Sequence, residues 1–146
     1  MEFYMRTLGI DFGLQRVGLA LSDPWGKMAL PYKTLRHQGR KKLVQDILHI
    51  LELEHVQRIV LGLPQNHSGE ENLGVRQVKN LARSLQRATG WQIYLLDETL
   101  SSYEAQQRLK SAGLRANKHK SVLDQQAAVV ILENFLQDPE QAQILQ

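Results

Sequence analysis

The order of the apolar segments restricts the fold of this chain more than any other feature. Strand-forming residues separated by turn signals predict β-strands at residues 4–12, 16–22 and 28–35. Gly13 and its neighbours form a tight turn between the first two strands. Pro31 cannot donate a hydrogen bond to a neighbouring strand, so it places the third strand at a sheet edge. The chain therefore opens with three antiparallel strands.

The rest of the chain alternates helices with short apolar runs. Apolar residues at helical spacing indicate amphipathic helices, and runs rich in β-branched residues indicate buried strands. In chain order, we expect a helix at 41–54, a strand at 58–63, a helix from about 75 that ends at Gly90, a strand at 91–96, a helix from about 102 to 112 and a helix from about 121 to 137. A helix crossover between successive strands makes them parallel, so we expect an α/β fold in which the opening hairpin continues into parallel strands.

One domain accounts for the length of the chain. A chain of 146 residues can bury roughly 68 to 70% of its unfolded surface, which is enough for a full hydrophobic core. No internal repeat or linker divides it. We expect a single domain over residues 1–138 and a frayed tail at 139–146, because Pro139 ends the last helix.

Several classes of protein are excluded by what the sequence lacks. There is no cysteine, so the chain has no disulfide framework, no thiolate zinc site and no cysteine nucleophile. It has no apolar stretch long enough for a signal peptide and no run of about 18 apolar residues that would span a membrane. We therefore expect a cytoplasmic protein with no membrane partner.

The charge of the chain is mildly basic. The formal net charge is +3 and the sequence pI is about 9.3, which fits a nucleic-acid partner and many other soluble proteins as well. The basic residues gather in two clusters, Arg36, His37, Arg40, Lys41 and Lys42 and then Arg108, Lys110, Arg115, Lys118, His119 and Lys120. Either cluster taken alone is typical of a solvated helix face.

Asp11 is the first candidate functional residue. It interrupts an apolar strand, and a lone buried carboxylate is costly unless a cation or hydrogen bonds compensate it. Gly9 and Gly13 on either side let a ligand or another backbone come close. The alternative is a carboxylate that hydrogen-bonds the following turn.

Two further acidic positions lie at the ends of elements. Asp97 and Glu98 stand where a buried strand ends, which is the place where open α/β sheets present ligand-binding groups. Strand alternation sends the two side chains to opposite faces, so one of them should point to the site, and Asp97 can instead cap the next helix. Asp124 shares a helix face with Ala128, although it also has capping-box spacing from Ser121.

Taken together, Asp11, Glu98 and Asp124 outweigh their separate structural explanations. They stand at a strand centre, a strand end and a helix start, and each is backed by apolar residues. Such carboxylates are hard-oxygen ligands for Mg²⁺ or Mn²⁺. A pair of such ions about 3.5 to 4 Å apart can activate water and stabilise the leaving oxygen of an in-line phosphoryl displacement. The three acids therefore predict a metal-dependent nuclease.

Four motifs, in this order, resemble those of the YqgF/RuvX family of RNase H-like nucleases. The motifs are LGIDFGLQRVGLALSD, VLGLPQNHSGEEN, LLDETLSSYEA and KSVLDQQAAVVIL, and they cover nearly the whole chain. Two residues depart from the family's pattern, since Gln15 stands where a lysine is common and Thr99 where an arginine often follows the acidic pair. Neither departure replaces an acid.

The resemblance implies both a fold and a function. It implies a mixed five-stranded sheet with helices on both faces, and maturation of the 5′ end of pre-16S ribosomal RNA in ribosome biogenesis. The family's acidic residues fall on Asp11, Glu98 and Asp124, with Mg²⁺ or Mn²⁺ as cofactor. We further expect nucleic-acid contacts from Arg16, Asn66, Lys118 and Lys120. The partners would be pre-rRNA or branched DNA and ribosomal particles, with the protein as a monomer or homodimer.

Other functions remain open from the sequence. The first is a Holliday junction resolvase in DNA recombination and repair, the activity first proposed for the family. The second is a non-catalytic nucleic-acid or ribosome-binding module, which the basic clusters support equally. A phosphate-handling ATPase of the actin and sugar-kinase type also opens with a strand-Asp-x-Gly hairpin, but it needs two such domains, and nothing after residue 63 repeats the first hairpin.

Overall fold

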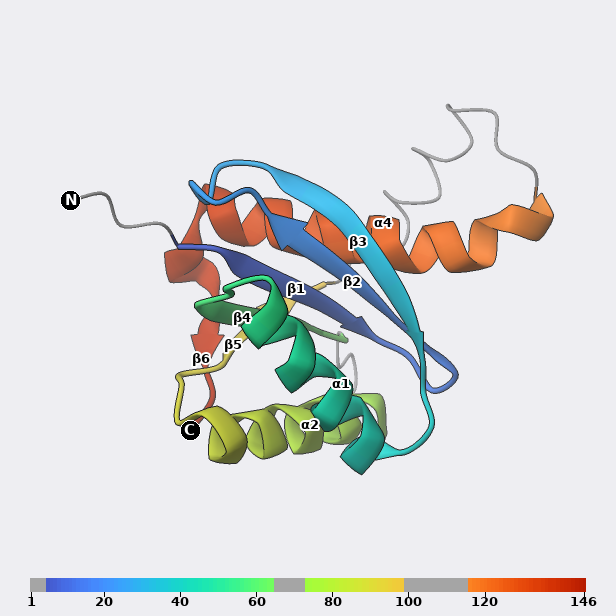
Figure 1. The fold of residues 1–146 in the computed structure, drawn as a ribbon, viewed down its shortest axis with the longest axis horizontal. Coiled ribbons are helices and arrows are strands. Elements are labelled where there is room, and N and C mark those ends of the chain that lie inside the picture. Colours follow the sequence, from blue (N-terminus) through green and yellow to red (C-terminus); the bar gives the residue numbers. More distant parts are fainter. Residues whose placement is uncertain (1–4, 65–72, 99–115) are drawn as a thin grey trace.

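The computed structural model describes residues 5–64, 73–98 and 116–146, and in the last helix it describes side chains from Gln125 onward. Its centre is a six-stranded mixed sheet in the order β3-β2-β1-β4-β5-β6 (Figure 1). In chain order the elements are β1 (Thr7–Phe12), β2 (Arg16–Ser22), β3 (Ala29–Arg36), α1 (Arg40–Leu53), β4 (Arg58–Leu63), α2 (Leu73–Thr89), β5 (Tyr94–Asp97), α4 (Ala116–Gln137), η1 (Pro139–Gln141) and β6 (Gln143–Ile144).

The three N-terminal strands form an antiparallel meander, as the sequence predicts. β1 pairs antiparallel with β2, and β2 pairs antiparallel with β3. The second pairing shifts its register between Leu19 and Ala20, and Pro31 lies opposite Ala20 at this irregularity. β3 is an edge strand, and an edge strand tolerates the missing backbone N–H of Pro31.

The parallel part of the sheet follows through helix crossovers. α1 leads from β3 to β4, which pairs parallel with β1, and α2 leads from β4 to β5, which pairs parallel with β4. The carboxyl ends of β1, β4 and β5 therefore lie at the same edge of the sheet. This is the edge at which α/β sheets present functional groups.

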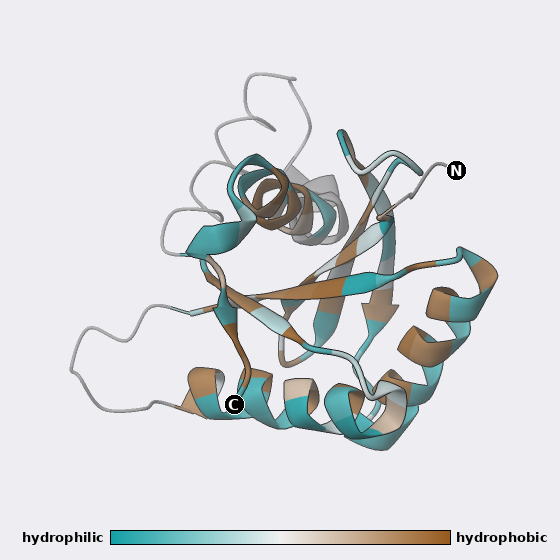
Figure 2. Cartoon of the chain, turned by 90° about the vertical axis from the view of Figure 1, so that its left-hand side faces the viewer, coloured by the Kyte–Doolittle hydropathy of each residue, from teal (hydrophilic) through white to brown (hydrophobic). Residues whose placement is uncertain are grey.

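Helices cover both faces of the sheet (Figure 2). α1 and α2 pack on one face, where Leu43, Ile47 and Leu81 join sheet residues such as Ile10 in the larger core. α4 packs on the other face, where its apolar side meets Val60 and Leu96. In β1 the side chains alternate between these two cores, since Leu8 and Ile10 belong to the first, whereas Gly9 lies against α4.

The strand count differs from the expected five because of the C-terminal residues. Where we expected a frayed tail, residues 139–146 form η1 and then β6, which pairs antiparallel with β5. Leu145 is buried in the larger core, and its backbone N–H donates to the Ile93 carbonyl oxygen at 2.9 Å. The sequence of residues 139–146 has no strand pattern, and the burial of Leu145 holds this segment against the sheet.

The last helix begins earlier than predicted. α4 starts at Ala116, so Ser121 lies inside the helix and does not cap it. Alanine and lysine are good helix formers, so the basic stretch at 116–120 extends the helix without any apolar periodicity. Lys118 and Lys120 thus belong to α4, although their side chains lie outside the described part. The helix expected at 102–112 also lies outside the described residues.

Candidate active site

The site is built on the α4 face of the sheet, around Asp11. Cross-strand pairing places Asp11 opposite Gly18 and Gly18 opposite Thr34, so these three positions form one row across the sheet. β1 and β4 run parallel in register up to Ile10 and Leu61, and one more residue brings Asp11 beside Gly62. Gly18 and Gly62 have no side chains, so other groups can approach the Asp11 carboxylate from both sides.

The same face of β1 packs closely on α4. A Cβ atom added at Gly9 would lie 3.0 Å from Leu132 Cβ and 3.1 Å from the Ala128 carbonyl oxygen. Gly9 therefore allows the helix to approach the backbone of β1. Asp11 lies two residues after Gly9 in β1. It is therefore on the same face and close to the preceding turn of α4.

Glu98 reaches the same place from the other side of β4. Leu96 packs on the α4 face, and alternation returns Glu98 to that face, whereas Asp97 is exposed. β5 is two strands away from β1, so the Glu98 side chain must cross β4 to approach Asp11. It crosses over Gly62, where an added Cβ atom would overlap Glu98 Oε2 and Ile131 Cδ1. The missing side chain at Gly62 is what lets the two acids meet.

The two carboxyl groups are in hydrogen-bonding contact, and this contact changes the acidity of Glu98. The pKa of Glu98 is raised to about 9, chiefly by burial and then, in decreasing order, by the negative charge of Asp11, the hydrogen bond with Asp11 and the charge of Asp97. Two buried carboxylates cannot both be ionised at short range without a cation. In the metal-free protein, therefore, the protonated Glu98 donates a hydrogen bond to the ionised Asp11.

The backbone of α4 brings position 124 to this row. The Gln125 side-chain Nε2 donates to Thr34 Oγ1 at 3.0 Å, and Thr34 is the β3 member of the Asp11 row. Position 124 also lies one helical turn before Ala128, which is fully buried against the sheet. The side chain of Asp124 itself lies outside the described part of the chain.

An open pocket of about 650 Å³ adjoins the row at the ends of β2 and β3. The described residues that line it are Leu14, Gln15, Arg16, Thr34, Arg36 and His37. Arg16, which we expected to contact nucleic acid, therefore lies beside the acids and on the same face. Of the other expected contacts, Asn66 lies outside the described residues, as do the side chains of Lys118 and Lys120.

The donor chemistry of the acids fits a hard divalent cation. Asp11 and Glu98 offer carboxylate oxygens, the ligand type that Mg²⁺ and Mn²⁺ prefer, and a bound cation would replace the shared proton. Among the side chains that the structure describes, no three histidine or acidic residues form a metal-binding group. Two of the three predicted acids thus come together, and the third stays a prediction.

Two supporting features escaped the sequence analysis. Gly62 interrupts the apolar run of β4, and a glycine inside a strand is a known sign of close approach by another group. That signal was present in the sequence. The contact between Gln125 and Thr34 joins residues 91 positions apart. Neither residue type predicts such a contact from the sequence.

The amino-acid sequence is similar to those of known proteins. The model of a family described as "RuvX: Holliday junction resolvase" matches residues 5–138. A protein of Maridesulfovibrio salexigens named "Putative pre-16S rRNA nuclease" is 48% identical over 90% of this chain and 98% of its own length. A protein of Nitratidesulfovibrio vulgaris with the same name is 43% identical over 97% of this chain and 99% of its own.

A solved structure resembles the whole fold. The structure of T. thermophilus RuvC in complex with a Holliday junction substrate superposes with a TM-score of 0.63, at 15% sequence identity, over 97% of this chain and 100% of that one. At this level of identity the likeness concerns the fold alone, and it confirms the RNase H-like architecture.

Among the described residues, no helix combines the length and the apolar character that a membrane span requires.

Proposed function

Because this chain belongs to the RuvX family of nucleases, we propose that it is a divalent-metal-dependent endonuclease whose main substrate is the precursor of 16S ribosomal RNA, cut in maturation of the 5′ end. The names of its relatives support the substrate. The family match over residues 5–138 supports a catalytic domain within residues 1–138.

The observation on which the proposal rests is the meeting of Asp11 and Glu98 over Gly62. Asp11 and Glu98 come from strands that are not neighbours, and they share one proton. Burying such a pair costs free energy and would not stabilise a purely structural core. A divalent cation stabilises both carboxylates at once. We assign Asp11 as the central ligand and Glu98 and Asp124 as the residues that complete the coordination.

Each residue has a distinct part in the reaction. Bound Mg²⁺ or Mn²⁺, as one ion or a pair, supplies activation of water and stabilisation of the leaving oxygen in an in-line displacement. Asp11, fixed at the centre of β1, sets the position of the reacting phosphate relative to the sheet. Glu98 gives up its proton when the site is loaded and then adds a second negative oxygen. Arg16 orients the substrate through a neighbouring phosphate.

The test is cleavage by the purified protein. With Mn²⁺ or Mg²⁺ it should cut RNA that carries the 5′ leader of 16S rRNA, and Asp11→Asn should reduce the rate by at least about a hundredfold. Asp46→Asn is the matched control, because Asp46 lies on α1 and pairs with Lys42 on the helix surface. Equal rates for wild type and Asp11→Asn would refute the proposal.

A second candidate substrate is branched DNA. The description of the matching family as a Holliday junction resolvase favours it. The same assay with a four-way DNA junction separates the two functions, since a ribosomal RNA nuclease should cut the leader RNA at the lower enzyme concentration. Metal-independent binding without turnover of either substrate would instead indicate a non-catalytic binding module.

A further inference from the structure

We propose that Arg16 and Arg36 form a phosphate-binding subsite that holds a backbone phosphate of the substrate strand next to the one that is cleaved. The subsite rests on the proposed nuclease function for its place in the reaction. It is defined by residues of β2 and β3 and includes none of the acids.

Strand register places the two arginines side by side. Arg16 and Arg36 are directly opposed in the β2–β3 ladder, two residues beyond the Gly18–Thr34 pair. Side chains directly opposite each other in an antiparallel pair point to the same face, with Cβ atoms roughly 4.5 to 5.5 Å apart. Because Gly18 also pairs with Asp11, both arginines lie on the face of the carboxylates and roughly 7 Å further along the sheet.

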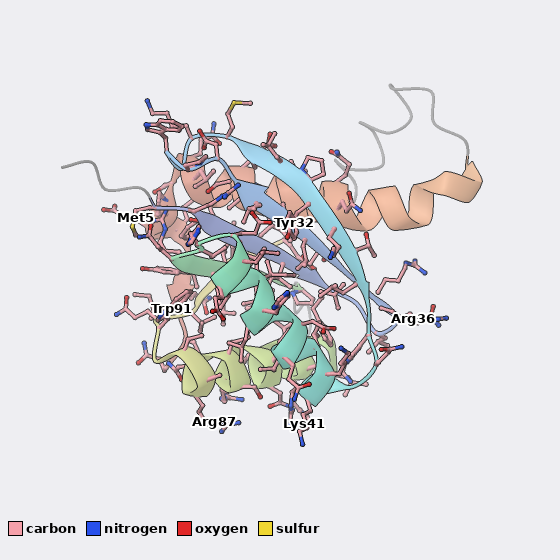
Figure 3. All side chains as sticks on the ribbon, viewed as in Figure 1. Met5, Tyr32, Arg36, Lys41, Arg87 and Trp91 are labelled. Atoms are coloured by element: carbon pink, nitrogen blue, oxygen red, sulfur yellow. The ribbon has the colours of Figure 1, made fainter. Side chains whose placement is uncertain are left out.

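The geometry of such a pair suits a phosphate. A phosphate placed between the guanidinium groups could accept hydrogen bonds from paired N–H donors of each of them. Arg36 is exposed at the end of β3 (Figure 3).

The backbone around the pocket is held in place before any ligand arrives. The His37 backbone N–H donates to the Gln15 carbonyl oxygen at 2.8 Å, and His37 Nδ1 lies 3.1 Å from the Leu14 carbonyl oxygen. The His37 ring also meets the Phe12 ring edge to face, with centroids 5.1 Å apart. These contacts tie the β1–β2 turn to the end of β3, so the backbone that carries the two arginines is held in place.

A strand of nucleic acid suits this geometry better than a free anion. The pocket is open and continuous with the Asp11 row through Thr34, which lines it. A phosphodiester chain repeats one negative charge per nucleotide, so one phosphate at the acids places the next within reach of the arginines. We therefore assign the subsite to a neighbouring phosphate of the same strand.

The experiment measures RNA binding without cleavage. Fluorescently labelled leader RNA is titrated in EDTA with wild type, Arg36→Gln and the control Lys33→Gln, which removes the same charge from the same strand on the opposite face. Arg36→Gln should weaken binding roughly tenfold at about 50 mM salt and lower the slope of log K against log salt by about 0.7. Lys33→Gln should bind like wild type. Equal effects of the two variants would overturn the subsite.

A substrate modification identifies the phosphate. Replacing the phosphate next to the cleavage position with an uncharged methylphosphonate should weaken binding by wild type more than binding by Arg36→Gln, since the variant has already lost one of the two arginine contacts. Additive losses would overturn the assignment. Inorganic phosphate as competitor should displace RNA only at far higher concentrations, whereas displacement at matching concentrations would indicate a simple anion site.

The two proposals can fail separately. If wild type binds RNA through Arg36 but never cleaves it, the nuclease function fails and the subsite stands. If wild type cleaves RNA and Arg36→Gln binds and cleaves like Lys33→Gln, the function stands and the subsite fails. Circular dichroism checks that the exposed substitutions leave the fold intact.

Discussion

Asp11 and Glu98 are separated by a complete strand, and a single glycine decides whether they meet. The sequence identifies Asp11 by its apolar surroundings, and strand alternation predicts that one residue of the Asp97–Glu98 pair faces the site. The structure shows that this residue is Glu98. The sequence alone cannot supply the crossing over Gly62, because that contact depends on which strand lies between β1 and β5.

Gly62→Ala tests this contact at the scale of one methyl group. The added Cβ atom meets the ends of two flexible side chains, so we expect a modest loss of stability, about 1 to 3 kcal/mol. Displacement of the Glu98 carboxylate should reduce the cleavage rate by at least about a hundredfold. Unfolding by urea and single-turnover cleavage measure the two effects. Combining Gly62→Ala with Glu98→Ala should relieve part of the stability loss, and a purely additive result would contradict the contact.

The raised pKa of Glu98 makes the stability of the metal-free protein depend on pH. The pKa of Glu98 is about 9 in the folded chain against an ordinary value of 4.5, chiefly because of burial. Between these values the unfolded chain releases the proton and the folded chain keeps it, so the free energy of unfolding falls as pH rises from about 4.5 to about 9. Glu98→Gln cannot ionise and should lose this dependence.

We therefore expect Glu98→Gln to be more stable than wild type in EDTA at pH 8 to 9, by on the order of 1 to 3 kcal/mol. Adding Mn²⁺ should stabilise wild type more than the variant, which has lost one of the proposed ligands. Denaturant unfolding across this pH range checks both results. Glu52→Gln, on the exposed face of α1, is the control and should follow wild type. A variant less stable than wild type at pH 9 would contradict the shared proton.

At the scale of elements, the predicted pattern holds where apolar periodicity is strong and fails where it is absent. The hairpin, α1 and β4 agree with prediction within one or a few residues, because alternation or helical spacing marks each of them. The start of α4 has no apolar periodicity, since Ala116 to Lys120 form a polar stretch. β6 has two residues, and its pairing depends on the burial of Leu145.

The proposed site depends on the close packing of α4 on β1. Gly9→Ala introduces a Cβ atom against Leu132 Cβ and the Ala128 carbonyl oxygen, neither of which is the flexible end of a side chain. The helix must move away, so we expect a stability loss of about 1 to 3 kcal/mol. We also expect weaker Mn²⁺ binding, measured by calorimetry, because α4 bears Asp124. Unchanged metal affinity with a displaced helix would show that α4 does not contribute a ligand.

At the scale of the whole molecule, the C-terminal residues close the sheet edge beside β5. Deleting residues 139–146 removes β6 and the buried Leu145, which exposes the backbone of the strand that leads to Glu98. We expect a loss of about 2 to 5 kcal/mol, from the buried leucine and the lost strand pairing, and self-association through the open edge. Thermal unfolding and light scattering measure these effects. Leu145→Ala should reproduce the stability loss without the association, and a truncated monomer as stable as wild type would contradict this role.

The chain order of the three acids has a consequence for protein synthesis. Asp11 leaves the ribosome with the first hairpin, whereas Glu98 follows much later and position 124 comes in the last long helix. Since α4 packs across β1, β2 and β3, that face of the sheet stays bare until α4 has been synthesised. With the proposed metal ligands, a nascent chain that still lacks α4 would have no complete metal site, so we expect competence to cut RNA only after α4 has packed on the sheet.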